Sequence, residues 1–253
     1  MSKPTTIKEV LVALDTIIAD CIATNSRLGL FAYLYRRTTA EVLKEVELGN
    51  FENNEQLQHM DVAFANLYLE AYKDFKLSKK VSKSWEFAFE KAEEPLTILQ
   101  HIMMGINAHI NLDLAIATSA LMKGKNIIDI EKDFNKVNEI LFNITNEMQD
   151  RLSRVSPLLF LLDLLGKNTD EKVIDFSMRK ARQQAWNSTN LLWALDESQQ
   201  PEAITKIDFL VLELAKIIKD PKSKIIEYLL KAIGKFEEKN VGEIISRLQQ
   251  ATH

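Results

Sequence analysis

The positions of glycine and proline constrain the fold of this chain more than any other feature. Its 253 residues include only seven glycines and five prolines, and most of them separate stretches in which apolar residues recur with helical spacing. Pro157 and Pro221 each follow a residue with a capping side chain, which is typical of a helix start. Gly49 and Gly124 each follow such a stretch, where the backbone often turns left-handed. The sequence therefore predicts helices joined by short turns.

Apolar periodicity predicts an all-α, single-domain multi-helix bundle over residues 1–253, built around a buried central helix at about 96–122. Strand-like alternation occurs at 107–113, but good helix formers flank this segment, so we expect it to be helical. The expected helices cover residues 6–23, 26–48, 55–76, 84–93, 96–122, 127–152, 157–165, 170–195, 202–219, 221–236 and 240–249.

Charge and cysteine content argue against several classes of protein. The net charge of -4 argues against a nucleic-acid binder, which usually has a basic face. No uninterrupted apolar run reaches the roughly 20 residues of a membrane span. The single cysteine, Cys21, cannot form an internal disulfide and is expected to be a small buried hydrophobe. The amino-terminal residues lack the apolar core of a signal peptide, so we expect a cytoplasmic protein.

Polar side chains interrupt the central helix at positions where apolar ones are expected. His109 and Asp113 are one turn apart, so they could bind one metal ion or form an acid–base pair. Asn107 and Asn111 share another side of the helix. His101 lies roughly 12 Å from His109 along the axis, too far to join the same mononuclear site. Buried polar groups are costly unless they are paired, so these positions indicate either structure or chemistry.

Other segments contribute further polar residues in apolar surroundings. Asp61 shares the inner face of its helix with Tyr68, and Asp163 is the single charge in an apolar run. Two cations are candidate partners for these carboxylates: Arg36 lies at the edge of an apolar stripe, and Arg182 shares a face with tryptophan. Interior ion pairs of this kind often only fix helix register, which is the structural alternative for each residue.

Together these residues predict a pocket between helices for a small, partly apolar molecule. In the leading hypothesis the protein is an enzyme, with hydrolysis as the mildest assumption about its chemistry. The expected catalytic residues are His109, Asp113 and Asp61. The expected substrate-binding residues are His101, Asn107, Asn111, Arg36, Arg182 and Tyr68. In a metal-assisted version, a divalent metal such as Mg, Mn or Fe would be held by His109, Asp113, Asp61 and Asp163.

Familiar catalytic and nucleotide-binding motifs are absent from the sequence: there is no P-loop, Gly-x-Gly-x-x-Gly, Gly-x-Ser-x-Gly, Cys-x-x-Cys or His-Glu-x-x-His. Two alternatives to an enzyme therefore stay open, a non-catalytic binding module and a structural or interaction protein with a polar core.

Gly105 interrupts the central helix, and we expect it to allow close approach by a neighbouring helix or a ligand. Apolar residues such as Ile217 and Ile225 could serve a homodimer, although ordinary amphipathic packing is the favoured interpretation.

Two strings of the sequence resemble recurrent motifs of an uncharacterised all-helical domain family found in bacteria and fungi. They are Met60-Asp-Val-Ala-Phe-Ala-Asn-Leu-Tyr-Leu and Gly105-Ile-Asn-Ala-His-Ile-Asn-Leu-Asp-Leu, the second of which fits the pattern Gly-x-Asn-Ala-His-Ile-Asn-x-Asp-Leu. The resemblance covers most of the chain and implies no particular activity. It implies that five polar residues belong together, namely Asp61, Asn107, His109, Asn111 and Asp113.

Overall fold

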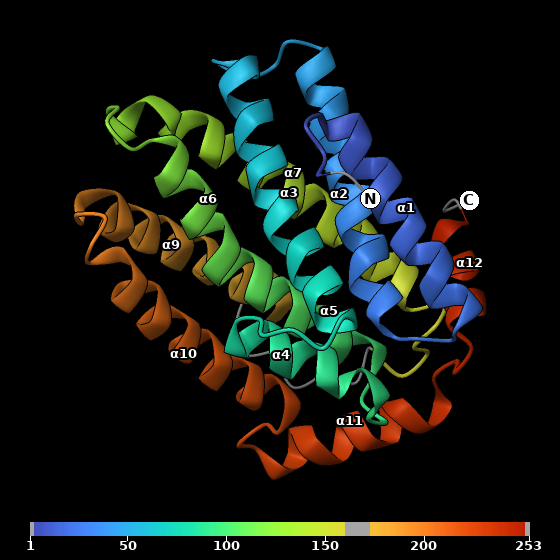
Figure 1. The fold of residues 1–253 in the computed structure, drawn as a ribbon. Helices are drawn as coiled ribbons and strands as arrows, with labels where there is room; N and C mark the ends of the chain where they lie inside the picture. Colours follow the sequence, from blue (N-terminus) through green and yellow to red (C-terminus); the bar gives the residue numbers. More distant parts are fainter. Residues whose placement is uncertain (1–2, 160–172, 251–253) are drawn as a thin grey trace.

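The fold, seen in a computed structural model, is built from helices and contains no strand in residues 3–159 and 173–250, which the structure describes (Figure 1). This confirms the predicted all-α class. The α-helices are α1 (Ile7–Ala23), α2 (Leu28–Glu47), α3 (Asn54–Lys76), α4 (Lys83–Glu90), α5 (Ile98–Ala108), α6 (Leu114–Leu121), α7 (Glu131–Leu152), α9 (Val173–Ala194), α10 (Gln200–Lys219), α11 (Lys224–Phe236) and α12 (Val241–Gln249).

The expected central helix is present and buried. It consists of α5, the short π-helix η2 (His109–Asp113) and α6, which follow one another without a break, and all five residues of η2 are buried. Helices α2 and α3 pack against this central element, as do α9 and α10. Figure 1 shows α6 between α3 and α9, with α10 beyond α9. A π-turn inside an α-helix often marks a functional site.

Some predicted boundaries differ from the structure. The expected helix at 84–93 ends as a 3₁₀ turn, η1 (Lys91–Glu93), and the one at 127–152 begins as another, η3 (Ile127–Ile130). Helix α11 begins three residues after Pro221, because Asp220 ends α10 in a non-helical conformation and the chain is extended again at Ser223. The helix expected at 157–165 lies largely outside the described residues.

Three glycines have the conformational roles expected of them. Gly49 and Gly124 have φ angles of 72° and 76°, in the left-handed region that favours glycine. Gly105 lies against the Phe31 ring of α2, where an added Cβ would be only 2.4 Å from Phe31 Cγ. The prediction of a close approach at Gly105 is therefore confirmed, and the neighbour is a helix.

Buried carboxylates from distant segments bind the amino-terminal ends of three helices. Asp133 accepts hydrogen bonds of 2.7 and 2.9 Å from the two amides that precede α3, and Asp208 accepts bonds of the same lengths from the first two amides of α4. Glu237 accepts a 2.9 Å bond from the amide of Ile98 at the start of α5. Helix starts carry unpaired N–H groups, so these carboxylates stabilise the ends and fix how the helices pack. None of the described helices is long and apolar enough to cross a membrane.

Candidate functional site

The His109 side chain is held by a carboxylate one turn along the central helix. Its Nδ1 lies 2.9 Å from Oδ2 of Asp113, and Nε1 of Trp85 in α4 donates to the same oxygen at 2.9 Å. An indole nitrogen is a donor only, so this oxygen acts as an acceptor. The tautomer that fits carries its proton on Nδ1, which leaves Nε2 as an acceptor. Both side chains are at most 5% exposed.

The His109 ring lines a cavity of about 60 Å3 in the bundle, several times the roughly 10–15 Å3 that one water molecule requires. Its Nε2 atom is buried and finds no hydrogen-bond partner in the part of the chain that the structure describes. The walls come from α2, α3, α7, α9 and the central helix. Most lining residues are apolar: Phe31, Leu34, Val42, Met60, Phe64, Ile106, Ile110, Leu114, Val137 and Ile144.

Two further ionisable groups line the same cavity. They are Asp61 from α3 and Arg182 from α9, both buried. Asp61 Oδ2 and Arg182 Nε have no hydrogen-bond partner within residues 3–159 and 173–250. Nη2 of Arg182 donates a long 3.4 Å hydrogen bond to the backbone carbonyl of Phe134. The guanidinium of Arg182 also lies 5.3 Å from the centre of the Phe134 ring. Buried polar atoms without partners are rare in proteins, and among the described residues four belong to side chains that line this cavity: His109 Nε2, Asp61 Oδ2, Arg182 Nε and the Tyr35 hydroxyl.

Aromatic rings hold the imidazole in place. Phe64 stacks on His109 with ring centres 3.6 Å apart and planes 10° from parallel. Tyr35 meets the His109 ring edge-on at 4.3 Å, and Phe31 does so at 5.7 Å. These contacts fix the ring orientation and reduce the contact of His109 with solvent.

Burial shifts the ionisation of each group at the cavity. It lowers the pKa of His109 well below its usual value and raises the pKa of Asp113. Burial also raises the pKa of Asp61 to about 7 and lowers the pKa of Arg182 to about 9. At neutral pH, His109 is therefore neutral, Asp61 is partly protonated and Arg182 keeps its positive charge. Oppositely shifted pKa values in one cavity are a recurring property of acid–base sites.

The two asparagines of the central helix do not join this group. Asn107 donates a 2.8 Å hydrogen bond to the carbonyl of Val211 in α10, and Asn111 donates a 3.0 Å bond to Asn107. Neither residue lines the His109 cavity. Asn107 thus ties the central helix to α10, on the separate side of the helix that its spacing indicated.

His101 and Tyr68 line a second, smaller space of about 20 Å3 beside Gly105. The buried Nε2 of His101 and the Tyr68 hydroxyl have no partner among the described residues. Burial, with the nearby positive charge of Arg27, lowers the pKa of His101 to about 3. The Tyr68 ring also packs on His109, with ring centres 5.9 Å apart. His101 is therefore a neighbour of the candidate site, separated from the larger cavity by the packing of Phe31.

The structure does not bring Arg36 to the cavity. Arg36 binds Asp15 through two hydrogen bonds of 2.8 and 3.1 Å at the molecular surface. Because Arg36 lies at the edge of the apolar stripe of α2, its long side chain reaches the solvent. Asp163, another expected site residue, lies outside the described residues.

Of the four expected metal ligands, Asp163 lies outside the described residues, and the other three, His109, Asp113 and Asp61, do not form a metal-binding group. Within the described ranges, no three His, Cys, Asp or Glu side chains lie close enough together to hold an ion. Asp113 Oδ2 already accepts from Trp85 and lies within hydrogen-bond distance of His109. His109, Asp113 and Asp61 therefore fit an acid–base arrangement better than a set of metal ligands.

Sequence reasoning missed two features of the site. The role of Trp85 depends on the packing of α4 against α5, for which nothing in the local sequence gives a signal. Helix α7 supplies Val137 and Ile144 to the cavity wall, where the sequence showed only ordinary amphipathic periodicity.

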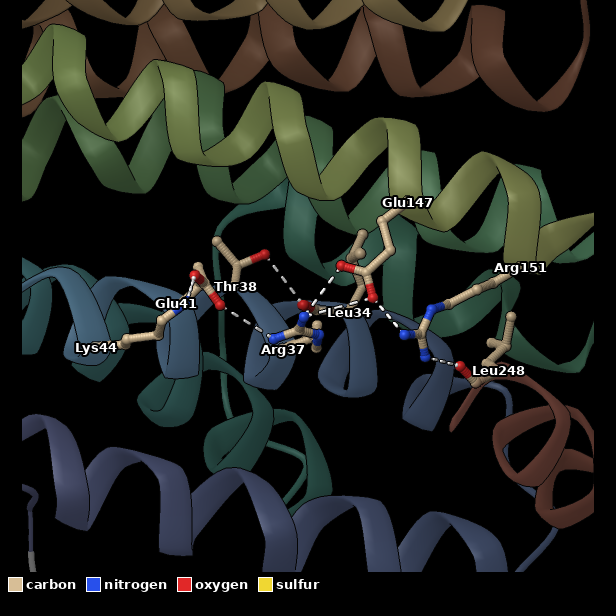
Figure 2. A network of polar contacts seen from close by, with 8 residues as sticks. All are labelled: Leu34, Arg37, Thr38, Glu41, Lys44, Glu147, Arg151 and Leu248. Atoms are coloured by element: carbon tan, nitrogen blue, oxygen red, sulfur yellow. Dashed lines mark hydrogen bonds and ion pairs between the residues drawn. The ribbon is translucent and has the colours of Figure 1, made fainter. Parts of the chain in front are cut away.

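A charged groove of about 490 Å3 adjoins the cavity along the seam between α2 and α7. Ile144 lines both spaces. Figure 2 shows the ion pair that crosses the seam, in which Arg37 of α2 binds Glu147 of α7 at 3.0 Å, and Arg151, also on α7, binds the same carboxylate. Leu34, on the neighbouring face of α2, lines the cavity. A single layer of α2 and α7 side chains thus separates the cavity from the groove.

The chain belongs to a family of unknown function, DUF5995, whose model matches residues 7–221. The matched region contains the central helix, Asp61, Arg182 and the cavity walls. No curated protein and no solved structure shows significant similarity to the chain. The family assignment therefore supplies no substrate, and a function must be argued from the site.

Proposed function

We propose that the protein is an enzyme that carries out acid–base chemistry, in the simplest case hydrolysis, on a small and mostly apolar molecule in the His109 cavity. The observation that carries this proposal is the state of the imidazole. Nδ1 of His109 is fixed by Asp113, while the buried Nε2 has no partner in the described chain and belongs to a side chain that lines a cavity. A histidine oriented by a carboxylate at one nitrogen and free at the other is arranged as a general base.

In this proposal, His109 Nε2 takes a proton from a water molecule as the water attacks a carbonyl carbon of the substrate. The resulting imidazolium is stabilised by Asp113, whose position is fixed by the Trp85 hydrogen bond. Asp61 supplies a proton to the leaving group, because a carboxyl with a pKa of about 7 is partly protonated at neutral pH. Water adds across the bond that breaks, giving an acid and an alcohol or amine.

Access to the cavity is proposed to run through the seam between α2 and α7. Ile144 lines both the cavity and the charged groove, and the ion pair of Arg37 with Glu147 joins α2 to α7 across the seam, while Glu41 on α2 also pairs with Arg37. These pairs are partly exposed and individually weak, so the seam can open at low cost.

Several finer expectations from the sequence remain proposals. The Gly-x-Asn-Ala-His-Ile-Asn-x-Asp-Leu pattern is proposed as a signature shared by bacterial and fungal relatives. A cytoplasmic location fits Cys21, which is buried and unpaired. A homodimer would use the exposed apolar side chains of α10 and α11, among them Ile217 and Ile225. A divalent metal is the least supported of these expectations, given the donor geometry around His109.

Non-catalytic binding is the second candidate function. The observation in its favour is the mostly apolar wall of the cavity, which would hold a ligand without any proton transfer. The two candidates differ in what His109 does, since a binding module does not need a free Nε2.

The decisive experiment measures hydrolysis of p-nitrophenyl esters of short fatty acids by the wild type, His109→Gln and His59→Gln. His59 is exposed on α3 and serves as the matched control. We expect His109→Gln to lower kcat/KM by at least about 100-fold and His59→Gln to leave it unchanged. Circular dichroism and the melting temperature check that each variant is folded. Equal rates in a folded His109→Gln variant, or no hydrolysis by the wild type, would contradict a hydrolase.

A further inference from the structure

Within residues 3–159 and 173–250, no carboxylate balances the charge of Arg182. Its side chain is buried, and among the described residues its Nε atom has no partner and its Nη2 makes a 3.4 Å bond to the neutral carbonyl of Phe134. No carboxylate of the described chain lies within ion-pair distance of it. Other arginines differ: Arg36 pairs with Asp15, and Arg247 pairs with Glu243 at 2.8 Å. Removing an unpaired cation from water is energetically unfavourable.

From this imbalance we infer that the cavity binds a small monocarboxylic acid, with its carboxylate on Arg182 and its alkyl part against the apolar walls. The inference rests on the cavity that the proposed function uses and specifies the class of its ligand. A guanidinium and a carboxylate form paired, charge-assisted hydrogen bonds, and the unpaired Nε–H lies on the edge of the guanidinium that makes them.

The walls of the cavity define the rest of the ligand. Apart from the ionisable residues, the lining offers aliphatic and aromatic carbon with few polar atoms, chiefly the hydroxyls of Tyr35 and Thr38. Thr38 already donates to the carbonyl of Leu34 at 3.1 Å. A ligand with one charged end and an apolar remainder therefore matches this lining, whereas a sugar or an amino acid would leave polar groups unpaired.

The charge of Asp61 and the volume of the cavity further restrict the class of ligand. Asp61 lines the same cavity and becomes negative as it ionises, so a dianion such as sulfate would meet repulsion that a single carboxylate meets only weakly. The cavity of about 60 Å3 suits an acid of a few carbons and excludes a long-chain fatty acid. The expected ligand is a short, unbranched or lightly branched monocarboxylate.

The test compares butyrate with neutral butyramide, cationic butylamine and inorganic sulfate by isothermal titration calorimetry and thermal shift, on the folded full-length chain near pH 6. We expect butyrate to bind at least about tenfold more tightly than butyramide, and butylamine and sulfate to bind more weakly still. This comparison uses only the wild type, so it does not depend on the folding of any variant. Equal affinity for butyrate and butyramide, or no binding of butyrate, would overturn the inference.

A second measurement assigns the preference to one residue. Arg182→Gln should lose the preference for butyrate over butyramide, whereas Arg247→Gln, which removes a cation from the surface, should keep it. Retained preference in a folded Arg182→Gln variant would contradict the assignment. Selective butyrate binding without ester hydrolysis would refute the proposed catalysis and leave this inference standing. Hydrolysis that depends on His109 without any preference for butyrate would refute this inference alone.

Discussion

The buried carboxylates at the helix ends and the buried Asp61 at the cavity differ in their hydrogen bonding. Asp208 accepts two backbone bonds and a 2.6 Å bond from the Ser84 hydroxyl, and Glu237 accepts bonds from a backbone amide and from Ser156. Asp61 is as deeply buried, yet its Oδ2 has no partner within the described part of the chain. The same residue type is thus fully satisfied where it joins helices and unsatisfied where it lines a cavity.

This difference is a criterion for separating structural polar groups from candidate functional ones without reference to any relative. A satisfied buried carboxylate contributes to stability, whereas an unsatisfied one destabilises the folded protein and is available to a ligand. Like Asp61, His109 and Arg182 each have a buried polar atom without a partner among the described residues, whereas the Asn107 side chain is hydrogen-bonded. The following predictions are ordered from the largest expected effect to the smallest.

The strongest effect is expected for Asp208→Ala. The change leaves two backbone amides at the start of α4 and the Ser84 hydroxyl without their acceptor, so we expect the free energy of unfolding to fall by roughly 3–5 kcal/mol. Asp220→Ala removes an exposed carboxylate that pairs with Lys219 and should cost less than about 1 kcal/mol. Urea denaturation measures both. A similar decrease in the free energy of unfolding for the two variants would show that the hydrogen bonds of Asp208 add no stability beyond that of an exposed carboxylate.

Gly105→Ala tests how tightly the apolar wall of the cavity is packed. The new Cβ would overlap the Phe31 ring, and Phe31 also lines the His109 cavity, so we expect a loss of about 2 kcal/mol in unfolding free energy. Gly234→Ala is the matched control, because its Cβ would meet Thr97 Cγ2 at an ordinary 3.6 Å. Helix propensity predicts a gain of up to about 1 kcal/mol for this control. A neutral Gly105→Ala variant would mean that Phe31 is free to move.

Asp61→Asn should stabilise the protein at pH 8. Burial raises the pKa of Asp61 to about 7 from its ordinary 3.8, so the folded state binds more protons than the unfolded state between these values. The stability that this carboxyl contributes is therefore lost as the pH rises from about 4 to 7 and stays lost above it. Asparagine cannot ionise, and we expect a gain of at least about 1 kcal/mol at pH 8 and little gain at pH 4.

The control for this prediction is Asp133→Asn, which should destabilise at pH 8 because this carboxylate binds two backbone amides. The charged or titratable side chains that line the cavity with Asp61 are Tyr35, His109 and Arg182. Thermal denaturation at both pH values measures the change. Equal stabilisation of Asp61→Asn at pH 4 and pH 8 would show that ionisation of Asp61 is not the cause.

The smallest change in stability is expected for Arg37→Gln. The variant loses two partly exposed ion pairs (Figure 2), one with Glu147 across the seam and one with Glu41 within α2, which should cost no more than about 1 kcal/mol. If the seam is the entrance, butyrate should associate faster with the variant, as followed by stopped-flow tryptophan fluorescence. An unchanged association rate would place the entrance elsewhere.

The local pattern of the sequence determined the helices and the residues that would be buried. Periodicity and turn residues predicted the all-α fold, the buried central helix and its polar positions. The i, i+4 spacing of His109 and Asp113 predicted their contact, since one helical turn brings such side chains together whatever surrounds them. Spacing also placed Asn107 and Asn111 on a separate side of the helix. These features depend only on geometry within one helix.

The tertiary structure alone decided which buried polar groups share a cavity. Asp61, His109 and Arg182 come from three helices, and their meeting depends on how α3, α9 and the central helix pack. The same packing turned Arg36 towards Asp15 and brought Trp85 to Asp113. Helical phase fixes the direction of a side chain around its own axis, but the neighbour it meets is set by the close packing of many apolar side chains. For this protein the sequence identified the polar residues, and packing brought three of them, Asp61, His109 and Arg182, to one cavity.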